Sequence, residues 1–253
     1  MARDMLIQHL VKRLRLPAMG RQYKKLAQEA TKENRPYEDF LLSLLELEVA
    51  QREDNTQKRL IAQARFPYLR TLDQFDFSTI PSVNKAMVLE LAKGEYLAKN
   101  ENVALVGNMG TGKTHVAIGL GLLACRQGKK VRFFTATGLI NDLVEAQEQH
   151  SLGRRLAQLQ KLDLLILDEV GFVPFTSDGA RLLFQVCAER YLKGSLLVTS
   201  NLEFSRWVEV FGDERMTGAL LDRLTHRCHV LEFNGDSHRF KESLKRQEAK
   251  AKP

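Results

Sequence analysis

The sequence predicts an α/β fold, in which a mostly parallel sheet is covered by helices and is preceded by a small all-helical N-terminal domain. From residue 100 onward, short apolar runs alternate with helical stretches, which is typical of parallel strands buried on both faces. Residues 1–65 instead repeat apolar side chains at helical spacing. With 253 residues, 44% of them apolar, the chain is long enough for one α/β domain and a smaller partner.

The first helix is expected to be amphipathic, with a basic outer face. In the stretch LIQHLVKRLRL, apolar side chains share one helical face, while Lys12 and Arg15 fall on the other. Pro17 and Gly20 end this helix, a second short helix follows, and Pro36 suits the first turn of a longer one. In the longer helix, the spacing predicts a stripe facing the core, made of Phe40, Leu41, Leu44, Leu45 and Val49.

Positive charge is concentrated at the start of the chain. Residues 1–35 hold nine basic and three acidic side chains, a net charge of +6, whereas the whole chain carries +7. A basic helical surface attracts polyphosphate, and duplex DNA is the expected partner, although a solvated basic face is the simpler alternative. The candidate DNA-binding residues in this segment are Lys12, Arg13, Arg15, Arg21, Lys24 and Lys25.

The stretch ARFPYLRTLDQFDFSTIP is expected to join the two domains, because Pro67 and Pro81 interrupt regular structure. This places the helical domain at residues 1–65 and the α/β domain at residues 66–253, with 66–82 as a linker.

Residues 107–114 read GNMGTGKT and follow an apolar run, NVALV, which fits the phosphate-binding pattern G-x-x-x-x-G-K-[ST] between a strand and a helix. Glycines let consecutive N–H groups point at phosphate oxygens, Lys113 would reach the β- and γ-phosphates, and the Thr114 hydroxyl would bind Mg²⁺. The sequence therefore predicts a nucleoside triphosphate with Mg²⁺. The candidate nucleotide-binding residues are Gly107, Asn108, Met109, Gly110, Thr111, Gly112, Lys113, Thr114 and His115.

The three later apolar runs read KVRFFT, LDLLIL and SLLVTS. Polar residues follow the second and the third of them. Asp168 and Glu169 end the middle run, at the expected carboxyl edge of the sheet. There, Asp168 could hold Mg²⁺ together with Thr114, and Glu169 could polarise an attacking water molecule. Asn201 follows the last run and is a candidate to orient that water, with a helix cap as the alternative. Candidate catalytic residues are thus Lys113, Asp168, Glu169 and Asn201.

The stretches GNMGTGKTH, LLILDEVGF, LLVTSN and ALLDRLTHR, with GDSHR after them, resemble the AAA+ ATPases of the initiator and helicase-loader group, and most closely the IstB family of transposase helpers. LRLPAMGRQY, YEDFLLSLLELEVAQRE and ARFPYLRTLDQFDF resemble the helical domain of those helpers, so the likeness covers nearly the whole chain. The resemblance implies an AAA+ P-loop ATPase with ATP and Mg²⁺ as cofactors, homo-oligomers with ATP sites at subunit interfaces, and an adenine-side segment within 66–82. It also implies binding to duplex DNA and a partner transposase, which the protein assists in target selection.

The resemblance further implies roles for four arginines. Arg223 stands where such ATPases carry an arginine finger for the neighbouring subunit, although by itself it also fits a helix-surface residue that forms an ion pair. Arg239 matches a later arginine that contacts nucleotide from the same chain. About fifty residues follow Asn201, fewer than the full helical lid of many AAA+ proteins needs. Arg154 and Arg155 are candidate DNA contacts in an extra helical element.

Three functions are compatible with these patterns: a transposition helper, a DnaC-like loader of a replicative helicase, and a small-molecule P-loop kinase. Glu169, Asn201 and Arg223 argue against the kinase. An N-terminal domain that binds duplex DNA by itself favours the helper, and one that binds a helicase hexamer favours the loader. The sequence contains neither a secretory signal pattern nor a membrane-length apolar stretch, so we expect a cytoplasmic protein.

Overall fold

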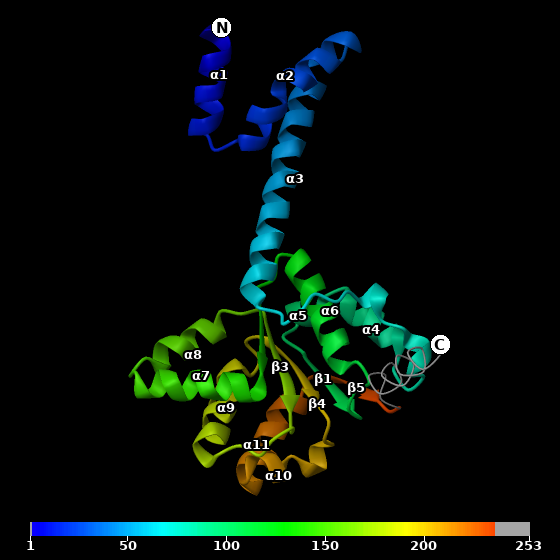
Figure 1. The fold of residues 1–253 in the computed structure, drawn as a ribbon, viewed down its shortest axis with the longest axis vertical. Helices are drawn as coiled ribbons and strands as arrows, with labels where there is room; N and C mark the ends of the chain where they lie inside the picture. Colours follow the sequence, from blue (N-terminus) through cyan, green and yellow to red (C-terminus); the bar gives the residue numbers. More distant parts are fainter. Residues whose placement is uncertain (1, 236–253) are drawn as a thin grey trace, which may run out of the picture. The chain divides into compact units, whose positions relative to one another are not determined.

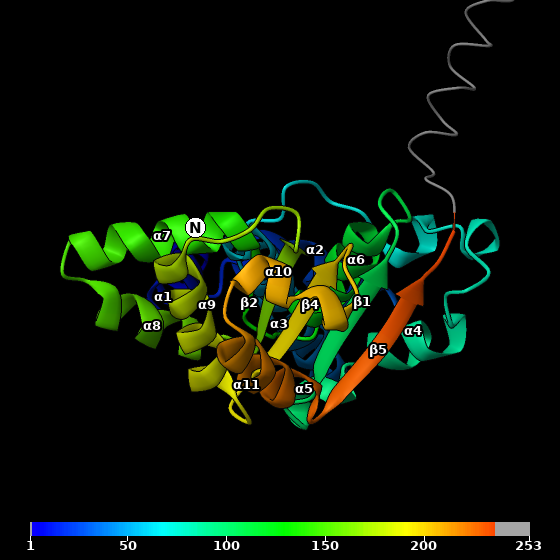
Figure 2. The same cartoon turned by 90° about the horizontal axis from the view of Figure 1, so that it is seen from below.

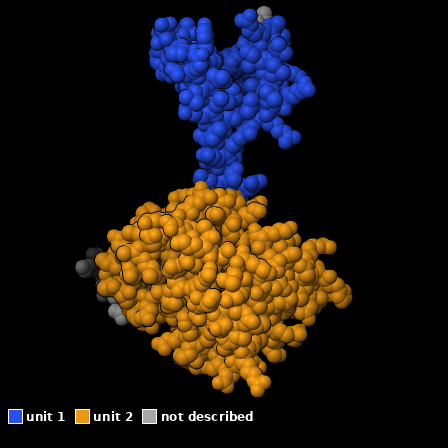
Figure 3. Space-filling view, turned by 180° about the vertical axis from the view of Figure 1, so that it is seen from behind, with its two compact units in different colours: residues 1–59 blue, residues 60–253 orange. Residues whose placement is uncertain are grey.

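The structure is a computed structural model that describes residues 2–235. The chain divides into two compact units, residues 1–59 and residues 60–253 (Figure 3). In the described part, no helix is long and apolar enough to cross a membrane. The first unit contains α1 (Ala2–Arg13), α2 (Pro17–Lys32) and most of α3 (Tyr37–Ala64), which continues into the second unit.

A buried carboxylate joins α2 to α3 in the first unit. Residue Leu16, which precedes α2, offers no side-chain cap to the helix. Glu48 of α3 takes this role, because its Oε2 accepts hydrogen bonds from the backbone N–H groups of Ala18 at 2.9 Å and Met19 at 3.2 Å. Only 3% of Glu48 is exposed. The carboxylate thus satisfies unpaired donors at the positive end of α2.

The predicted stripe of α3 is wrong for three of its five residues. Leu44 is buried, but Leu41, Leu45 and Val49 are about half exposed. The side-chain spacing is helical, as expected, yet the contacts of α2 with α3 follow the line of Glu48 and Gln51. Helix α2 covers only part of the α3 surface on which the apolar residues lie, so the remaining apolar residues face outward.

The second unit is built on a parallel sheet. Its strands are β1 (Asn102–Gly107), β2 (Val131–Thr135), β3 (Leu164–Val170), β4 (Ser195–Ser200) and β5 (Cys228–Phe233). They lie in the order β2-β3-β4-β1-β5, and every pairing is parallel. Figure 2 shows the edge strand β5 beside β1. This confirms the α/β fold with a parallel sheet, and it adds β5, an edge strand that the four apolar runs did not predict.

Helices cover both faces of this sheet (Figure 1). The helices are α4 (Lys85–Ala92), α5 (Glu95–Ala98), α6 (Lys113–Arg126), α7 (Ala136–Glu148), α8 (Leu152–Gln160), α9 (Ser177–Arg190), α10 (Val208–Phe211) and α11 (Glu214–Thr225). The first three and the end of α3 pack with Leu164 and Ile166, whereas α7 to α11 pack with Leu165 and Leu167. Neighbouring residues of β3 thus serve opposite cores, as the alternation of strand side chains requires.

Four helix starts of the second unit have polar caps that the sequence supplies locally. In each case, a side-chain oxygen just before the helix accepts a hydrogen bond from a backbone N–H of the first turn. These caps are Asn84 for α4, Thr135 for α7, Thr176 for α9 and Asp213 for α11. At the start of α6, Gly112 occupies the cap position and has no side chain with which to cap the first turn.

The Asn102 side chain ties three elements together at the start of β1. Its Nδ2 donates to the carbonyl oxygen of Leu224 at the end of α11, and its Oδ1 accepts from the N–H of Leu196 in β4, both at 2.9 Å. The carbonyls of a last helical turn have no partner within the helix, so this amide satisfies one of them.

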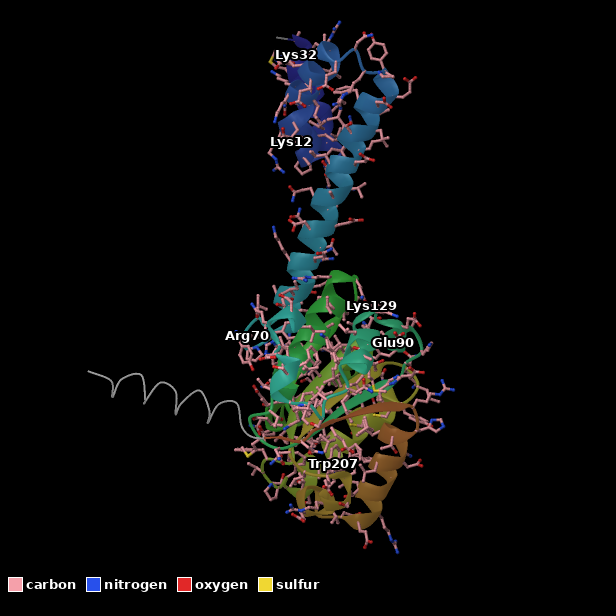
Figure 4. The ribbon with its side chains drawn as sticks, turned by 90° about the vertical axis from the view of Figure 1, so that its right-hand side faces the viewer. Lys12, Lys32, Arg70, Glu90, Lys129 and Trp207 are labelled. Carbon is pink, nitrogen blue, oxygen red and sulfur yellow. The ribbon has the colours of Figure 1, made fainter. Side chains whose placement is uncertain are left out.

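We expect Asn102→Ala to lower the free energy of unfolding of the second unit by about 2 to 4 kcal/mol, because a buried N–H and a buried C=O each lose their partner. Fluorescence of Trp207 during denaturant titration measures this, because it is the chain's single tryptophan and is buried in the second unit (Figure 4). The exposed Asn55→Ala is the control, with an expected change below about 0.5 kcal/mol. Equal unfolding midpoints for both variants would contradict the structural role of Asn102.

Candidate nucleotide-binding site

The loop GNMGTGKT connects β1 to α6, and its outer glycines occupy places that other residues cannot take. Gly107 has a φ of +140°, and a Cβ there would lie 2.3 Å from the carbonyl oxygen of Phe233. Gly112 has a φ of +88°, and a Cβ there would lie 2.5 Å from the ring of Phe75. The backbone can therefore curl tightly in front of the α6 N-terminus, whose N–H groups attract phosphate.

The side chain of Lys113 lies inside this loop. Only 8% of the residue is exposed, and its Nζ donates to the carbonyl oxygens of Gly107 at 2.7 Å and Asn108 at 2.6 Å. The hydroxyl of Thr111 also donates to the oxygen of Asn108, at 2.7 Å. The ammonium group is therefore directed at the centre of the loop, where phosphate oxygens bind in this motif.

The carboxylate of Asp168 links the loop to the sheet. The hydroxyl of Thr114 donates to both of its oxygens, at 2.9 and 3.2 Å, and the hydroxyl of Thr199 donates to Oδ1 at 2.6 Å. Asp168 is 4% exposed, and its strand β3 lies beside β4, which carries Thr199. One buried carboxylate thus joins the start of α6, the end of β3 and the end of β4.

A pocket opens in front of this network, and it brings together residues from three distant parts of the sequence. Loop residues 109–115 form one wall, and Glu169, Thr199 and Asn201 line it from the sheet. The remaining wall comes from the linker, with Tyr68, Arg70, Gln74, Phe75, Asp76, Thr79 and Ile80. Glu169 and Asn201, two of the sheet-end residues that the sequence singled out, therefore meet the phosphate loop in one cavity.

His115 holds the linker wall against the loop. Its Nε2 lies 2.8 Å from the carbonyl oxygen of Thr71, and its ring meets the Phe75 ring edge to face, with centroids 5.4 Å apart. Short 3-10 turns at Leu72–Gln74 and Phe77–Thr79 shape this wall. An aromatic and polar wall opposite a phosphate loop is suited to a nucleotide base.

Metal-binding side chains are sparse at this site. Within residues 2–235, no group of three or more His, Cys, Asp or Glu side chains is placed to hold a metal ion. Thr114 and Asp168 supply hard oxygen atoms, and Mg²⁺ typically binds through one or two such groups together with phosphate oxygens and water. The donors present thus fit Mg²⁺ carried by a nucleotide better than a metal held by the protein alone.

Arg223 does not line the pocket of its own chain as far as the structure describes it. It lies in the last turn of α11, half buried, with Nη1 donating to the carbonyl oxygen of Ala219 at 2.6 Å. Its guanidinium lies 5.4 Å from the ring centroid of Phe184. The other predicted nucleotide contact, Arg239, falls outside the described residues.

The candidate DNA-binding residues differ in how free their charges are. In the first unit, Lys12, Arg13 and Arg15 are exposed, and Figure 4 labels Lys12. The other three of this group have partners nearby: Lys24 pairs with Asp4 at 2.7 Å, Arg21 donates to Gln51 at 3.1 Å, and Lys25 lies 3.8 Å from Glu29.

In the second unit, Arg154 and Arg155 both lie on α8, but only Arg154 is exposed. Arg155 is bonded to Asp142 through Nε at 2.5 Å, and its guanidinium lies 5.6 Å from the ring centroid of Phe134. Arg154 is therefore the more accessible of the two candidates.

Sequence reasoning missed Thr199 as a member of the site. It is a polar residue near the end of the apolar run SLLVTS, at the same carboxyl edge of the sheet as Asp168. That position is the signal that could have identified it. The residues of the linker wall were anticipated only as a range, because their side-chain positions depend on contacts with His115 and the loop.

Sequence comparison relates this chain to ATP-binding proteins of insertion sequences. A family model described as IstB-like ATP binding protein matches residues 9–246. The chain is 36% identical to an ATP-binding protein of insertion sequence IS5376 from Geobacillus stearothermophilus over 93% of this chain and 94% of that protein. It is 38% identical to one of insertion sequence IS21 from Pseudomonas aeruginosa, over 93% of this chain and 89% of that protein.

Solved structures of replication proteins share the fold. AMPPCP-bound DnaA from Aquifex aeolicus superposes with a TM-score of 0.53 and 24% identity, over 70% of this chain and 55% of DnaA. The DnaC helicase loader superposes with a TM-score of 0.51 and 18% identity, over 70% of this chain and 99% of the loader. At these identities the likeness shows the fold, which is that of the AAA+ P-loop proteins.

We expect Lys113→Ala to weaken nucleotide binding by at least about 100-fold, because phosphate charge loses its ammonium partner in a buried position. Titration with a fluorescent ATP analogue measures this. The control is Lys99→Ala, which removes an exposed lysine that pairs with Glu95 at 3.6 Å on the surface next to α5. A Lys113→Ala protein that binds the analogue as the parent does would show that this loop is not the nucleotide site.

Proposed function

This chain belongs to the IstB-like ATP-binding protein family, and we propose that it assembles on target DNA with ATP and assists a transposase in target selection during DNA transposition. The chain matches insertion-sequence ATP-binding proteins along nearly their whole length. Its basic, exposed N-terminal residues give it a surface suited to a polyanion. The presence of a phosphate loop in the second unit and of such a surface in the first supports the proposal that DNA binding by this protein depends on nucleotide.

The chain is an ATPase of the AAA+ class. In the proposed mechanism, the loop N–H groups and Lys113 would bind the phosphates, and Thr114 and Asp168 would hold Mg²⁺, which would supply positive charge against them. Asn201 would orient the attacking water and Glu169 would take up its proton, while the γ-phosphoryl group passes to the water oxygen and ADP leaves. This assignment is supported by the pocket, where Glu169 and Asn201 face the same cavity as the loop.

Arg223 completes the proposed site from a neighbouring subunit. Phosphoryl transfer needs positive charge at the γ-phosphate, and an arginine supplied by a second molecule is worth about 10³ to 10⁵ in rate. The place of Arg223 on α11, away from the pocket lining of its own chain, supports action on another chain. Hydrolysis would then require a homo-oligomer, which DNA would help to assemble.

A DnaC-like loader of a replicative helicase shares the fold of the second unit and is the alternative function. The two functions differ in what the N-terminal unit binds. Duplex DNA binding by the isolated protein supports the transposition helper, whereas binding to a helicase hexamer without duplex DNA would support the loader.

We expect simultaneous replacement of Lys12, Arg15, Arg21 and Lys24 by Gln to weaken binding to duplex DNA and to flatten its salt dependence. Each lost phosphate contact should reduce the slope of log affinity against log salt by roughly 0.9. Fluorescence anisotropy with a labelled duplex at several salt concentrations measures the slope, and ATP binding should be unchanged.

The matched control replaces Lys93, Lys99, Lys129 and Lys193 by Gln, which changes the net charge equally at positions in the second unit. Its slope should stay close to that of the parent protein. If both quadruple variants alter the slope by the same amount, overall charge and not the N-terminal surface accounts for DNA binding.

We expect a mixture of Arg223→Ala and Lys113→Ala proteins to regain ATP hydrolysis, although each variant is nearly inactive alone. In a mixed assembly, some interfaces combine an intact phosphate loop with an intact arginine of the neighbour. Phosphate release at increasing protein and DNA concentration measures this, and Arg126→Ala serves as the control for loss of an exposed arginine. A mixture that co-assembles but stays inactive would assign Arg223 to its own chain's structure.

A further inference from the structure

Thr199 lies beside the carboxyl pair Asp168–Glu169, and none of the roles proposed above involves it. It is 2% exposed and stands near the end of β4, between β1 and β3. Its hydroxyl donates to Oδ1 of Asp168 at 2.6 Å, and its Oγ1 accepts from the backbone N–H of Glu169 at 2.9 Å. One side chain therefore contacts both residues of the pair, through the side chain of one and the backbone of the other.

The pairing of β3 with β4 is irregular at this point. Leu167 pairs with Val198 and Val170 pairs with Ser200, with a shift of register between them. Two residues of β3, Asp168 and Glu169, thus lie opposite the single residue Thr199. Such a bulge breaks the backbone ladder locally and re-aims side chains, and it leaves an unpaired backbone N–H.

Glu169 has the backbone conformation that this bulge requires. Its φ of +61° lies in the left-handed region, which costs a non-glycine residue free energy unless surrounding contacts enforce it. Its backbone N–H donates to the Thr199 hydroxyl at 2.9 Å. In a regular strand, the side chains of Asp168 and Glu169 would point to opposite faces of the sheet. In this structure Asp168 bonds to Thr199, and Glu169 lines the pocket together with Thr199.

We propose that Thr199 is a positioning residue for ATP hydrolysis: its hydroxyl orients the Asp168 carboxylate and holds the bulge that directs Glu169 into the nucleotide pocket. The inference rests on the proposed roles of Asp168 and Glu169. A hydroxyl suits this position because it donates to one group and accepts from the other at the same time. Valine has nearly the same shape and can do neither.

The test compares Thr199→Val with Thr199→Ser in steady-state ATP hydrolysis. We expect Thr199→Val to lower kcat about 10- to 100-fold, as for the loss of a hydrogen bond to a charged group, with KM for ATP within about twofold of the parent. Thr199→Ser keeps the hydroxyl and should restore most of kcat. Affinity for a fluorescent ATP analogue should be nearly the same in all three proteins, because the phosphate loop is intact.

Amide hydrogen exchange, measured without nucleotide, tests the geometry independently of turnover. The amide of Glu169 should exchange faster in Thr199→Val than in the parent, and Thr199→Ser should return it toward the parental rate. Ser195→Ala is the control on the same strand, because the Ser195 hydroxyl is buried and its oxygen makes no hydrogen bond in the described part of the structure. It should retain parental turnover.

Glu169→Gln separates this inference from the catalytic assignment beneath it. If Glu169→Gln is inactive while Thr199→Val turns over normally, Thr199 has no positioning role and the proposed catalytic pair stands. If both variants turn over normally, the catalytic assignment itself is wrong. Failure of Thr199→Ser to restore activity, or an equal loss in Ser195→Ala, would also overturn the proposal, because the hydroxyl would then not be the cause.

Discussion

The buried carboxylate of Asp168 is the interaction on which the site depends. It accepts hydrogen bonds from Thr114 at the start of α6 and from Thr199 at the end of β4, and it stands itself at the end of β3. A carboxylate that is 4% exposed is tolerated only with such donors. The same contacts that stabilise the charge therefore set the distance between the phosphate loop and the residues proposed to activate water.

Residues close to that carboxylate hold backbone conformations with positive φ, and dense packing lies on both sides of the sheet that carries it. Gly107 and Gly112 hold left-handed conformations in the loop, and Glu169 holds one without being a glycine. The central strands β1, β3 and β4 are buried between two apolar clusters, so they resist relaxation of these conformations. Conformations that cost free energy persist where the surroundings enforce them, which is characteristic of functional sites.

Different interactions stabilise the two units. The α/β unit buries long apolar side chains on both faces of its sheet. Among the described residues of the first unit, Ala18 and Leu44 are the buried apolar ones, and hydrogen bonds to Glu48 join α2 to α3. This contrast suits the proposed division of work, in which the α/β unit performs chemistry and the helical unit offers a charged surface to DNA.

The sequence by itself determined the α/β class, the phosphate loop and the carboxyl pair Asp168–Glu169, because these depend on local patterns: periodicity, glycine spacing and the polar end of an apolar run. It also supplied the resemblance that led to the family. Only the tertiary structure decided the rest. The sequence of edge strand β5, CHVLEF, interrupts its apolar residues with His229 and Glu232, and its pairing with β1 joins residues far apart in the chain. Which apolar residues of α3 are exposed depends on how much of its surface the shorter helix α2 covers. The importance of Thr199 depends on a register shift between β3 and β4, which no single stretch of sequence encodes, because a shift of register is a relation between two strands.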